Sequence, residues 1–194
     1  EPHEFEPFLA VCSPLHRIRA GFVLETGLRS AEIVHARWSW VQRGIGRPSI
    51  RIDADNETGF VPKWGNARIV PLSVEAQALL AEAREAWPIS DFIFSERKLS
   101  HPNFARDNRL ACDRAGLHRV DFHGLRRSSG SRWLAHGFEL IEVSRLLGHR
   151  EISTTARWYL GISPGRLASR FDVMDEAAEA TAAGRVVPLR PVER

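Results

Sequence analysis

The chain has 194 residues and a formal net charge of +3, and its isoelectric point is near 9.4. Its apolar fraction of 43% is enough for the core of one domain, and because no run of about 18 apolar residues occurs, we expect no membrane-spanning segment. The two cysteines, Cys12 and Cys112, lack the spacing of a metal site, which favours a reduced, intracellular protein without a bound metal.

Arginine dominates the cationic side chains, since Lys63 and Lys98 are the only lysines among 27 Lys and Arg residues. The planar guanidinium group binds phosphate through two parallel hydrogen bonds, so this preference suits a nucleic-acid partner. GC-rich codon usage produces the same excess. The composition therefore permits nucleic-acid binding without requiring it.

The N-terminal part of the chain predicts two helices and then a small sheet. Residues 15–27 read as a helix that ends at Gly27, a residue typical of the position after a helix. A second helix is expected with Ser30 as its N-cap and Glu32 in its first turn. The stretches PSIRIDA and ARIVPL alternate apolar and polar residues, so residues 47–72 are expected to form an antiparallel unit.

The remainder of the chain is predicted to be helical. Ser73 suits the N-cap of the next helix, and Ser153 or Thr154 suits the cap of a short helix that reaches Tyr159. Further helices are expected over residues 102–116, 124–136 and 138–147, and in an exposed segment after Pro164. The predicted fold class is therefore mainly α with a small antiparallel β-sheet, an α+β arrangement.

Four stretches place cations or imidazoles at breaks between these elements. They are TGLRSAE, PKWGNARIVPL, FHGLRR and LLGHR, and they carry Arg29, Lys63, His123, Arg126 and His149. The only tyrosine of the chain, Tyr159, follows ten residues after the last of these. Taken singly, each is more often an ordinary surface charge or helix-end residue. A lone tyrosine, however, indicates a use for the hydroxyl group, because Phe or Trp serves where only packing matters.

Together these side chains have the chemistry of metal-free phosphoryl transfer. Arginines neutralise and orient a phosphodiester, a hydroxyl nucleophile needs a base, and a leaving alkoxide needs an acid. The motifs contain no carboxylate cluster of the kind that binds Mg²⁺, which weakens the alternative of a two-metal nuclease.

The four stretches resemble, in order, the sequence boxes of the tyrosine recombinase catalytic domain of the phage-integrase family. LETGLRSAEIVHARW resembles the first arginine box, and KWGNARIVPL resembles the β-hairpin, with Lys63 five residues before Arg68. HGLRR resembles the His-x-x-Arg box and LLGHREISTT the last histidine box. The resemblance extends over residues 20–160, and four boxes in the family's order are far more specific than any one of them.

The resemblance implies how the phosphate would be held. Arg29 and Arg126 would clamp the scissile phosphate, and His149 would hydrogen-bond one of its oxygens. Glu32 matches an acidic position of the family and would orient the site, although a plain first-turn carboxylate is the alternative.

The resemblance also implies the reaction. Tyr159 would attack phosphorus, giving a 3′-phosphotyrosyl link and a free 5′ hydroxyl, with His123 accepting the phenol proton and Lys63 protonating the leaving oxygen. Because the link conserves the bond energy, no cofactor, metal or ATP is expected.

Two residues depart from the family pattern. The tyrosine usually stands nine residues after the last histidine, where this chain has Trp158, and Tyr159 stands one residue later. In a helix one residue is a rotation of about 100°. The residue after the second arginine is often histidine, and here it is Arg127, a change expected to affect support of the site rather than its chemistry.

The departures leave two alternatives to a site-specific recombinase or integrase. One is a non-catalytic DNA-binding protein of the same fold, which the displaced tyrosine favours. The other is a type IB topoisomerase, although the compact TGLR and LLGH boxes are more typical of integrases.

The expected organisation is a catalytic domain over residues 1–163 and a C-terminal helix and flexible tail over residues 164–194, without the family's N-terminal core-binding domain in this chain. The expected partner is double-stranded DNA, on which the full-length protein would form a tetramer. The helix near 165–183 would dock on a neighbouring protomer or pack on its own. The expected location is the bacterial cytoplasm, in the nucleoid, with a mobile element, phage or plasmid as the source.

Overall fold

The structure is a computed structural model that describes residues 5–43, 46–57, 59–65, 67–95, 101–118 and 120–159, with only the backbone for 101–103 and 158–159. The chain divides into two compact units, Glu1–Ala156 and Arg157–Arg194. The described helices and strands belong to the first unit, apart from the end of the last helix. The helix and tail expected after Pro164 lie outside the described residues.

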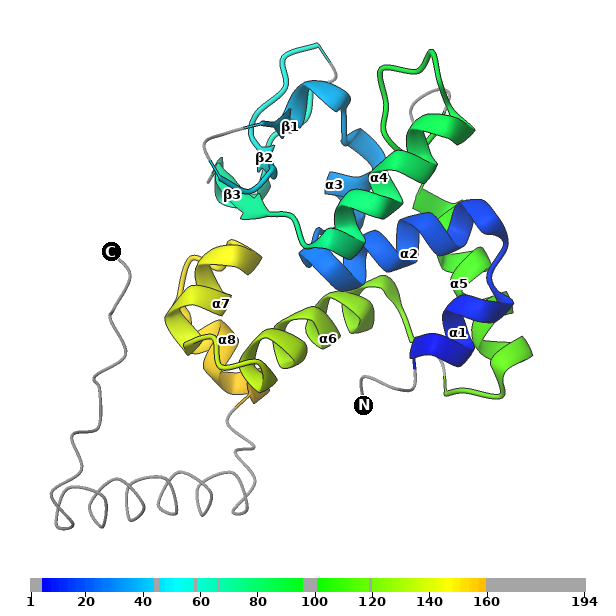
Figure 1. The fold of residues 1–194 in the computed structure, drawn as a ribbon. Coiled ribbons are helices and arrows are strands. Elements are labelled where there is room, and N and C mark those ends of the chain that lie inside the picture. Colours follow the sequence, from blue (N-terminus) through cyan, green and yellow to red (C-terminus); the bar gives the residue numbers. More distant parts are fainter. Residues whose placement is uncertain are drawn as a thin grey trace, which may run out of the picture. The chain divides into compact units, whose positions relative to one another are not determined.

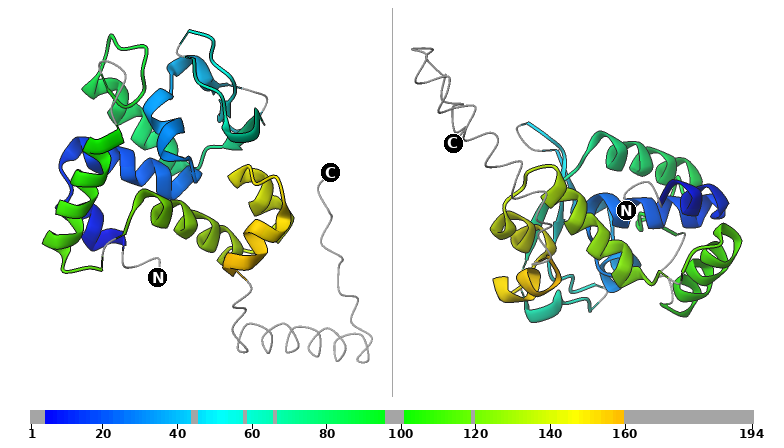
Figure 2. Two further views of the ribbon diagram at one scale, coloured as in Figure 1. Left: turned by 180° about the vertical axis from the view of Figure 1, so that it is seen from behind. Right: turned by 90° about the horizontal axis from the view of Figure 1, so that it is seen from below.

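Helix α2 (Pro14–Thr26) is the central element, and it packs against α4 (Val74–Ala86) and α6 (Phe122–Ala135) (Figures 1 and 2). The helix ends as predicted, because Gly27 adopts φ +62° and donates its N–H to the carbonyl of Val23. A larger residue would require a shift, since a Cβ on Gly27 would lie 2.8 Å from the side chain of Leu147. The predicted N-cap of α4, Ser73, is confirmed, because its side-chain hydroxyl oxygen accepts a hydrogen bond from the backbone N–H of Ala76.

Two further helices, α1 (Phe5–Val11) and α5 (His101–Ala115), pack against each other beside α2 (Figure 1). The first was not predicted from the sequence. The second follows the prediction closely, ending before Gly116 at φ +65°. The core between these helices is apolar, and it includes Phe8, Phe22 and Phe94.

The sheet has three antiparallel strands in the order β1 (Val41–Gln42), β2 (Ser49–Ile52) and β3 (Arg68–Pro71). The two predicted strands are confirmed, while the two-residue strand β1 carries too little pattern to predict. In β3 the side chains alternate, so that Val70 is buried and Ile69 is exposed. Arg68 lies on the buried side of this strand, which is an unusual place for a charge.

Two predicted helix caps are wrong, one at the helix that follows Arg29 and one at the last described helix. Helix α3 (Ser30–His35) has Arg29 rather than Ser30 as its N-cap residue, because the Glu32 carboxylate accepts the backbone N–H of Arg29 at 2.7 Å. The short 3₁₀ helix η2 (Trp38–Trp40) follows this helix in the chain.

Helix α8 (Ile152–Tyr159) begins at Ile152, so Ser153 and Thr154 lie inside its first turn instead of capping it. Helix α7 (Leu140–Leu147) packs against α6 and β3 and ends, as predicted, before Gly148 at φ +63°. None of the helices in the described part of the chain is long and apolar enough to cross a membrane.

Candidate active site

The first arginine box and the last histidine box meet where α2 and α7 end. Arg29 follows α2 and donates from Nη2 to the carbonyl oxygen of Gly148 at 2.8 Å, a contact between residues 119 positions apart in the sequence. Its side chain is 19% exposed, so part of it remains accessible from solvent.

Arg126, one turn into α6, forms hydrogen bonds to the ends of the same two helices. Its Nη1 donates to the carbonyl of Gly27 and its Nη2 to the carbonyl of Leu147, and the residue is only 2% exposed. The last carbonyls of a helix lack partners within the helix and carry its negative dipole end, so a buried cation is stable there. The arginine thereby joins α2, α6 and α7 at one point.

Beneath Arg29 lies a buried ion pair between Glu32 and Arg68. Arg68 donates from Nη1 and Nη2 to the two carboxylate oxygens at 2.7 and 2.6 Å, and from Nε to the carbonyl of Leu146 at 2.9 Å. Glu32 also accepts from Nη1 of Arg29 at 3.0 Å. The carboxylate thus accepts hydrogen bonds from both arginines and connects β3 to Arg29.

The pKa of the Glu32 carboxyl is lowered to about 2 although the residue is only 1% exposed. Burial raises this pKa, but the hydrogen bonds and charge of Arg68, followed by the charges of Arg126 and Arg29, outweigh burial. Glu32 is therefore ionised at neutral pH. Its contacts exceed those of a plain first-turn carboxylate, and its orienting role stays a prediction.

The sequence motifs do not predict a site role for Arg68, which enters them only as the residue five positions after Lys63. The signal that could have identified it is its phase in the strand, because it occupies an inward position in an alternating pattern whose other inward member, Val70, is apolar. A charge at such a position requires a buried partner.

His149 follows α7 and is held on both sides. Its backbone N–H donates to the Ser144 carbonyl at 3.0 Å, and its Nδ1 lies 2.8 Å from the hydroxyl oxygen of Thr155. Burial, followed by the charges of Arg126 and Arg29, lowers its pKa to about 4. The imidazole is therefore neutral at pH 7. Thr155, which is fully buried, was not predicted.

His123 lies in the first turn of α6, exposed at the rim of the same cluster. Its pKa is lowered by burial and then by the charge of Arg126, with Asp121 acting in the opposite direction. A neutral imidazole in a positive field has a free lone pair, so it can accept a proton from a nearby group.

Lys63 lies in the 3₁₀ turn η3 (Lys63–Gly65) of the connection between β2 and β3. It is exposed, and its ammonium group is 5.7 Å from the centroid of the Trp64 ring. Tyr159 is the last residue of α8 and belongs to the second unit, and its side chain lies outside the described residues. The catalytic roles of both residues stay predictions.

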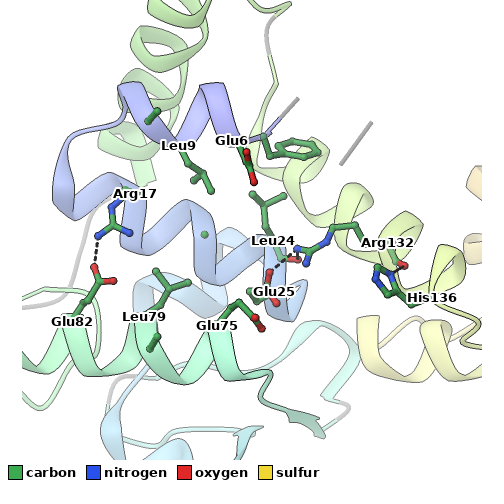
Figure 3. A pocket seen from close by; sticks show the side chains of 14 residues that line it. Glu6, Leu9, Arg17, Leu24, Glu25, Glu75, Leu79, Glu82, Arg132 and His136 are labelled. Atoms are coloured by element: carbon green, nitrogen blue, oxygen red, sulfur yellow. Dashed lines mark hydrogen bonds and ion pairs between the residues drawn. The ribbon is translucent and has the colours of Figure 1, made fainter. Parts of the chain in front are cut away.

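A hollow of about 1020 Å³ adjoins the cluster and is lined by His123, Ser30 and three arginines, Arg106, Arg109 and Arg127. A second hollow, of about 750 Å³, lies between α1, α2 and α4 and reaches the end of α6 (Figure 3). Arg29, Lys63, His123, Arg126 and His149, the predicted catalytic residues whose side chains are described, do not line this second hollow. Among the described residues, no group of three or more His, Cys, Asp and Glu side chains could hold a metal ion.

The second hollow has an apolar floor and a charged rim. Leu9, Leu24 and Leu79 form part of the floor, and the rim carries the Arg132–Glu25 ion pair at 2.6 Å (Figure 3). The ion pair joins α2 to α6.

Residues 2–165 match the model of the phage integrase family. The chain belongs to this family. Among curated phage-integrase relatives, a tyrosine recombinase XerC-like protein from Caldanaerobacter subterraneus subsp. tengcongensis is 26% identical over 195 residues, covering 83% of this chain and 50% of that protein. Tyrosine recombinase XerD from Brucella suis biovar 1 is 35% identical over 143 residues, covering 67% of this chain and 43% of that protein. This phage-integrase chain thus spans about half the length of these relatives.

Solved structures share the fold at lower identity. XerA recombinase superposes with a TM-score of 0.72 at 17% identity, covering 90% of this phage-integrase chain and 64% of the other. XerH site-specific recombinase bound to difH substrate, in a pre-cleavage complex, gives a TM-score of 0.65 at 23% identity, covering 87% of this chain and 52% of the other. The predicted fold class is therefore confirmed as that of a tyrosine recombinase catalytic domain.

Proposed function

We propose that this chain cuts and rejoins strands of double-stranded DNA as the catalytic part of a site-specific recombinase, through a 3′-phosphotyrosyl intermediate. The observation that carries the proposal is the meeting of three boxes at one place. Arg29 donates to the carbonyl of Gly148 and Arg126 to the carbonyls of Gly27 and Leu147, at the ends of α2 and α7. The backbone N–H of His149 donates to the carbonyl of Ser144 in α7. Ordinary surface charges have no reason to converge over such sequence distances.

The scissile phosphate binds where Arg29 is accessible. Guanidinium groups orient and neutralise its non-bridging oxygens, and the surrounding ion pair keeps Arg29 fixed before DNA arrives. His149 adds a neutral donor. When the Thr155 hydroxyl donates to Nδ1, the proton of the neutral ring resides on Nε2, which then donates to a phosphate oxygen.

The chemical step is a displacement at phosphorus. The phenol oxygen of Tyr159 forms a bond to phosphorus as the bond between phosphorus and the 5′ oxygen breaks. The phenol proton passes to His123, and Lys63 gives a proton to the departing 5′ oxygen. Rejoining is the same step in reverse, with a 5′ hydroxyl as the nucleophile. No net bond energy is lost, so no external energy source or cofactor is required.

The proposal extends to organisation and partners. Residues 1–163 act as the catalytic domain, and residues 164–194 supply a C-terminal helix and tail, with the segment near 165–183 as a contact to a neighbouring protomer. The full-length protein assembles as a tetramer on double-stranded DNA. Its place of action is the bacterial cytoplasm, where a mobile element, phage or plasmid is recombined.

A non-catalytic DNA-binding protein of the same fold is the second candidate function. It is favoured by Trp158, which occupies the usual position of the tyrosine. A type IB topoisomerase shares the covalent step but relaxes supercoiled DNA without joining two sites. Supercoil relaxation by the purified protein separates this third candidate from a recombinase.

The test is covalent capture on DNA. A library of nicked duplexes with randomised sequence, incubated with the protein at low salt, requires no knowledge of the target site. Strand breakage near the nick releases a short fragment and traps the protein on the 3′ phosphate. We expect an adduct that survives denaturation, and complete absence of adduct in a protein that binds the library would favour the non-catalytic candidate.

A further inference from the structure

Trp64 occupies a position that disfavours tryptophan on two counts. Its side chain is 64% exposed, and its backbone has φ +69°, the only positive φ of a non-glycine residue in the described part of the chain. Bulky L-residues rarely adopt this region because Cβ approaches the backbone carbonyl. The exposure removes core packing as the reason for keeping a tryptophan there.

The indole ring has a cation beside it. The ammonium group of Lys63 lies 5.7 Å from the Trp64 ring centroid, within the range of a cation–π interaction, and tryptophan is the strongest partner for one. The turn that carries the ring is itself fixed. The N–H of Gly65 donates to the carbonyl of Pro62 at 2.8 Å, and the proline ring restricts the backbone before Lys63.

We propose that Trp64 is a positioning residue for Lys63, holding its ammonium group over the indole face so that the proton donor is ordered before cleavage. The inference rests on the proposed function, in which Lys63 protonates the leaving 5′ oxygen. A free lysine side chain samples many rotamers, and each must be given up when the ammonium reaches the oxygen. A ring that restricts those rotamers in advance lowers that cost.

The strain at Trp64 provides a clean substitution. Glycine readily adopts φ +69°, so Trp64→Gly removes the ring and relieves the strain together, and the melting temperature should stay equal or rise. Trp64→Asn keeps a side chain that tolerates this backbone, and Trp64→Phe keeps an aromatic ring. Val61→Ala is the matched control, because Val61 is also 64% exposed in the same connection.

The experiment measures single-turnover cleavage on a nicked duplex recovered from the covalent capture. Trp64→Gly and Trp64→Asn should slow cleavage about two- to five-fold, the effect of an exposed cation–π contact. Trp64→Phe should lie between them and the wild type, and Val61→Ala should match the wild type. On the same duplex with a bridging 5′ sulfur, whose departure needs no acid, none of these substitutions should slow the reaction.

The Lys63→Ala background separates positioning from any independent effect. There, the further change Trp64→Gly should cause no additional slowing, because its action passes through the lysine. Upfield shifts of the Lys63 side-chain protons, produced by the indole ring current, should disappear in Trp64→Gly and give a readout that does not depend on activity.

Several outcomes would overturn the inference. Equal slowing on the oxygen and sulfur substrates, additive slowing in the Lys63→Ala background, or absent ring-current shifts would each do so. A loss of DNA affinity that accounts for the whole effect would assign Trp64 to DNA stacking instead. Adduct formation with unchanged rates in Trp64→Gly would reject this inference alone, whereas a wild-type protein without any adduct would reject the proposed function and the inference together.

Discussion

Arg68 donates hydrogen bonds from Nη1 and Nη2 to the two carboxylate oxygens of Glu32, at 2.7 and 2.6 Å, and both residues are buried. The pair joins β3 to α3, and the same carboxylate holds Arg29 at 3.0 Å. Arg29, which is proposed to bind the scissile phosphate, is thus held by a buried carboxylate that is itself held by a strand residue. The stability of the site and the stability of the fold are linked through this pair.

Removing one member of this pair should strongly destabilise the fold. Arg68→Met leaves a buried, ionised Glu32, and we expect the free energy of unfolding to fall by about 3–5 kcal/mol in urea titrations. Arg51→Met is the control, because Arg51 pairs with Asp53 at 2.7 Å but both side chains are well exposed. That exposed pair should contribute less than about 1 kcal/mol. Similar losses in the two variants would contradict the bracing role.

The dependence of the free energy of unfolding on acid pH should show the contribution of the same ion pair. The pKa of Glu32 falls from its ordinary value of 4.5 to about 2 on folding, so the unfolded state takes up the proton first as the pH drops. The stabilisation is complete above pH 4.5 and is lost as the pH falls towards about 2, a change of about 3 kcal/mol. Glu32→Gln should flatten this part of the pH–stability curve. An unchanged slope in that variant would remove Glu32 as its source.

His149 should titrate near pH 4 in the free protein, well below an ordinary imidazole. Binding of inorganic phosphate should raise this pKa, because an anion offsets the arginine charges that oppose imidazolium. Nitrogen NMR shifts should show the proton of the neutral ring on Nε2, and Thr155→Val should abolish that preference. A proton on Nδ1 in the wild type would contradict the assigned donor role.

Gly148 and Gly116 allow strain and crowding to be separated. Both have positive φ, +63° and +65°, so alanine is strained at either position by about 1 kcal/mol. A Cβ on Gly148 would also lie 2.8 Å from Cδ of Arg68, whereas a Cβ on Gly116 meets open space. Gly148→Ala should therefore lose more stability than Gly116→Ala and should also slow cleavage. Equal losses of stability would contradict the prediction and would show that the Arg68 side chain shifts at little cost in free energy.

Local signals in the sequence predict much of this fold. Gly27 and Gly148 mark two helix ends because glycine is favoured in their left-handed backbone conformation, and the alternation of β2 and β3 identifies the sheet. Local signals fail where a tertiary contact decides. Ser30 has the hydroxyl of an ordinary cap, yet the cap lies at Arg29 because a carboxylate held by a distant strand takes its N–H.

The same distinction applies to the candidate site. The sequence boxes, taken in the family's order, predict Arg29, Arg126, His123 and His149 as a set. They do not predict Thr155 and Arg68, the buried residues that form hydrogen bonds within the site. Thr155 resembles any helix threonine until His149 is placed against it, and Arg68 resembles a surface arginine until the inward face of β3 is known. Supporting residues are defined by contacts across the fold, which spacing along the chain does not encode.

The nucleophile is the central claim, and covalent capture on nicked DNA tests it most directly. Tyr159→Phe removes one oxygen and little volume, so folding and DNA binding should survive while the covalent adduct disappears. Trp158→Phe, the neighbouring control at the family's usual tyrosine position, should still form the adduct. The account predicts adduct with the wild type and Trp158→Phe and none with Tyr159→Phe. A Tyr159→Phe protein that still links to the 3′ phosphate would contradict it.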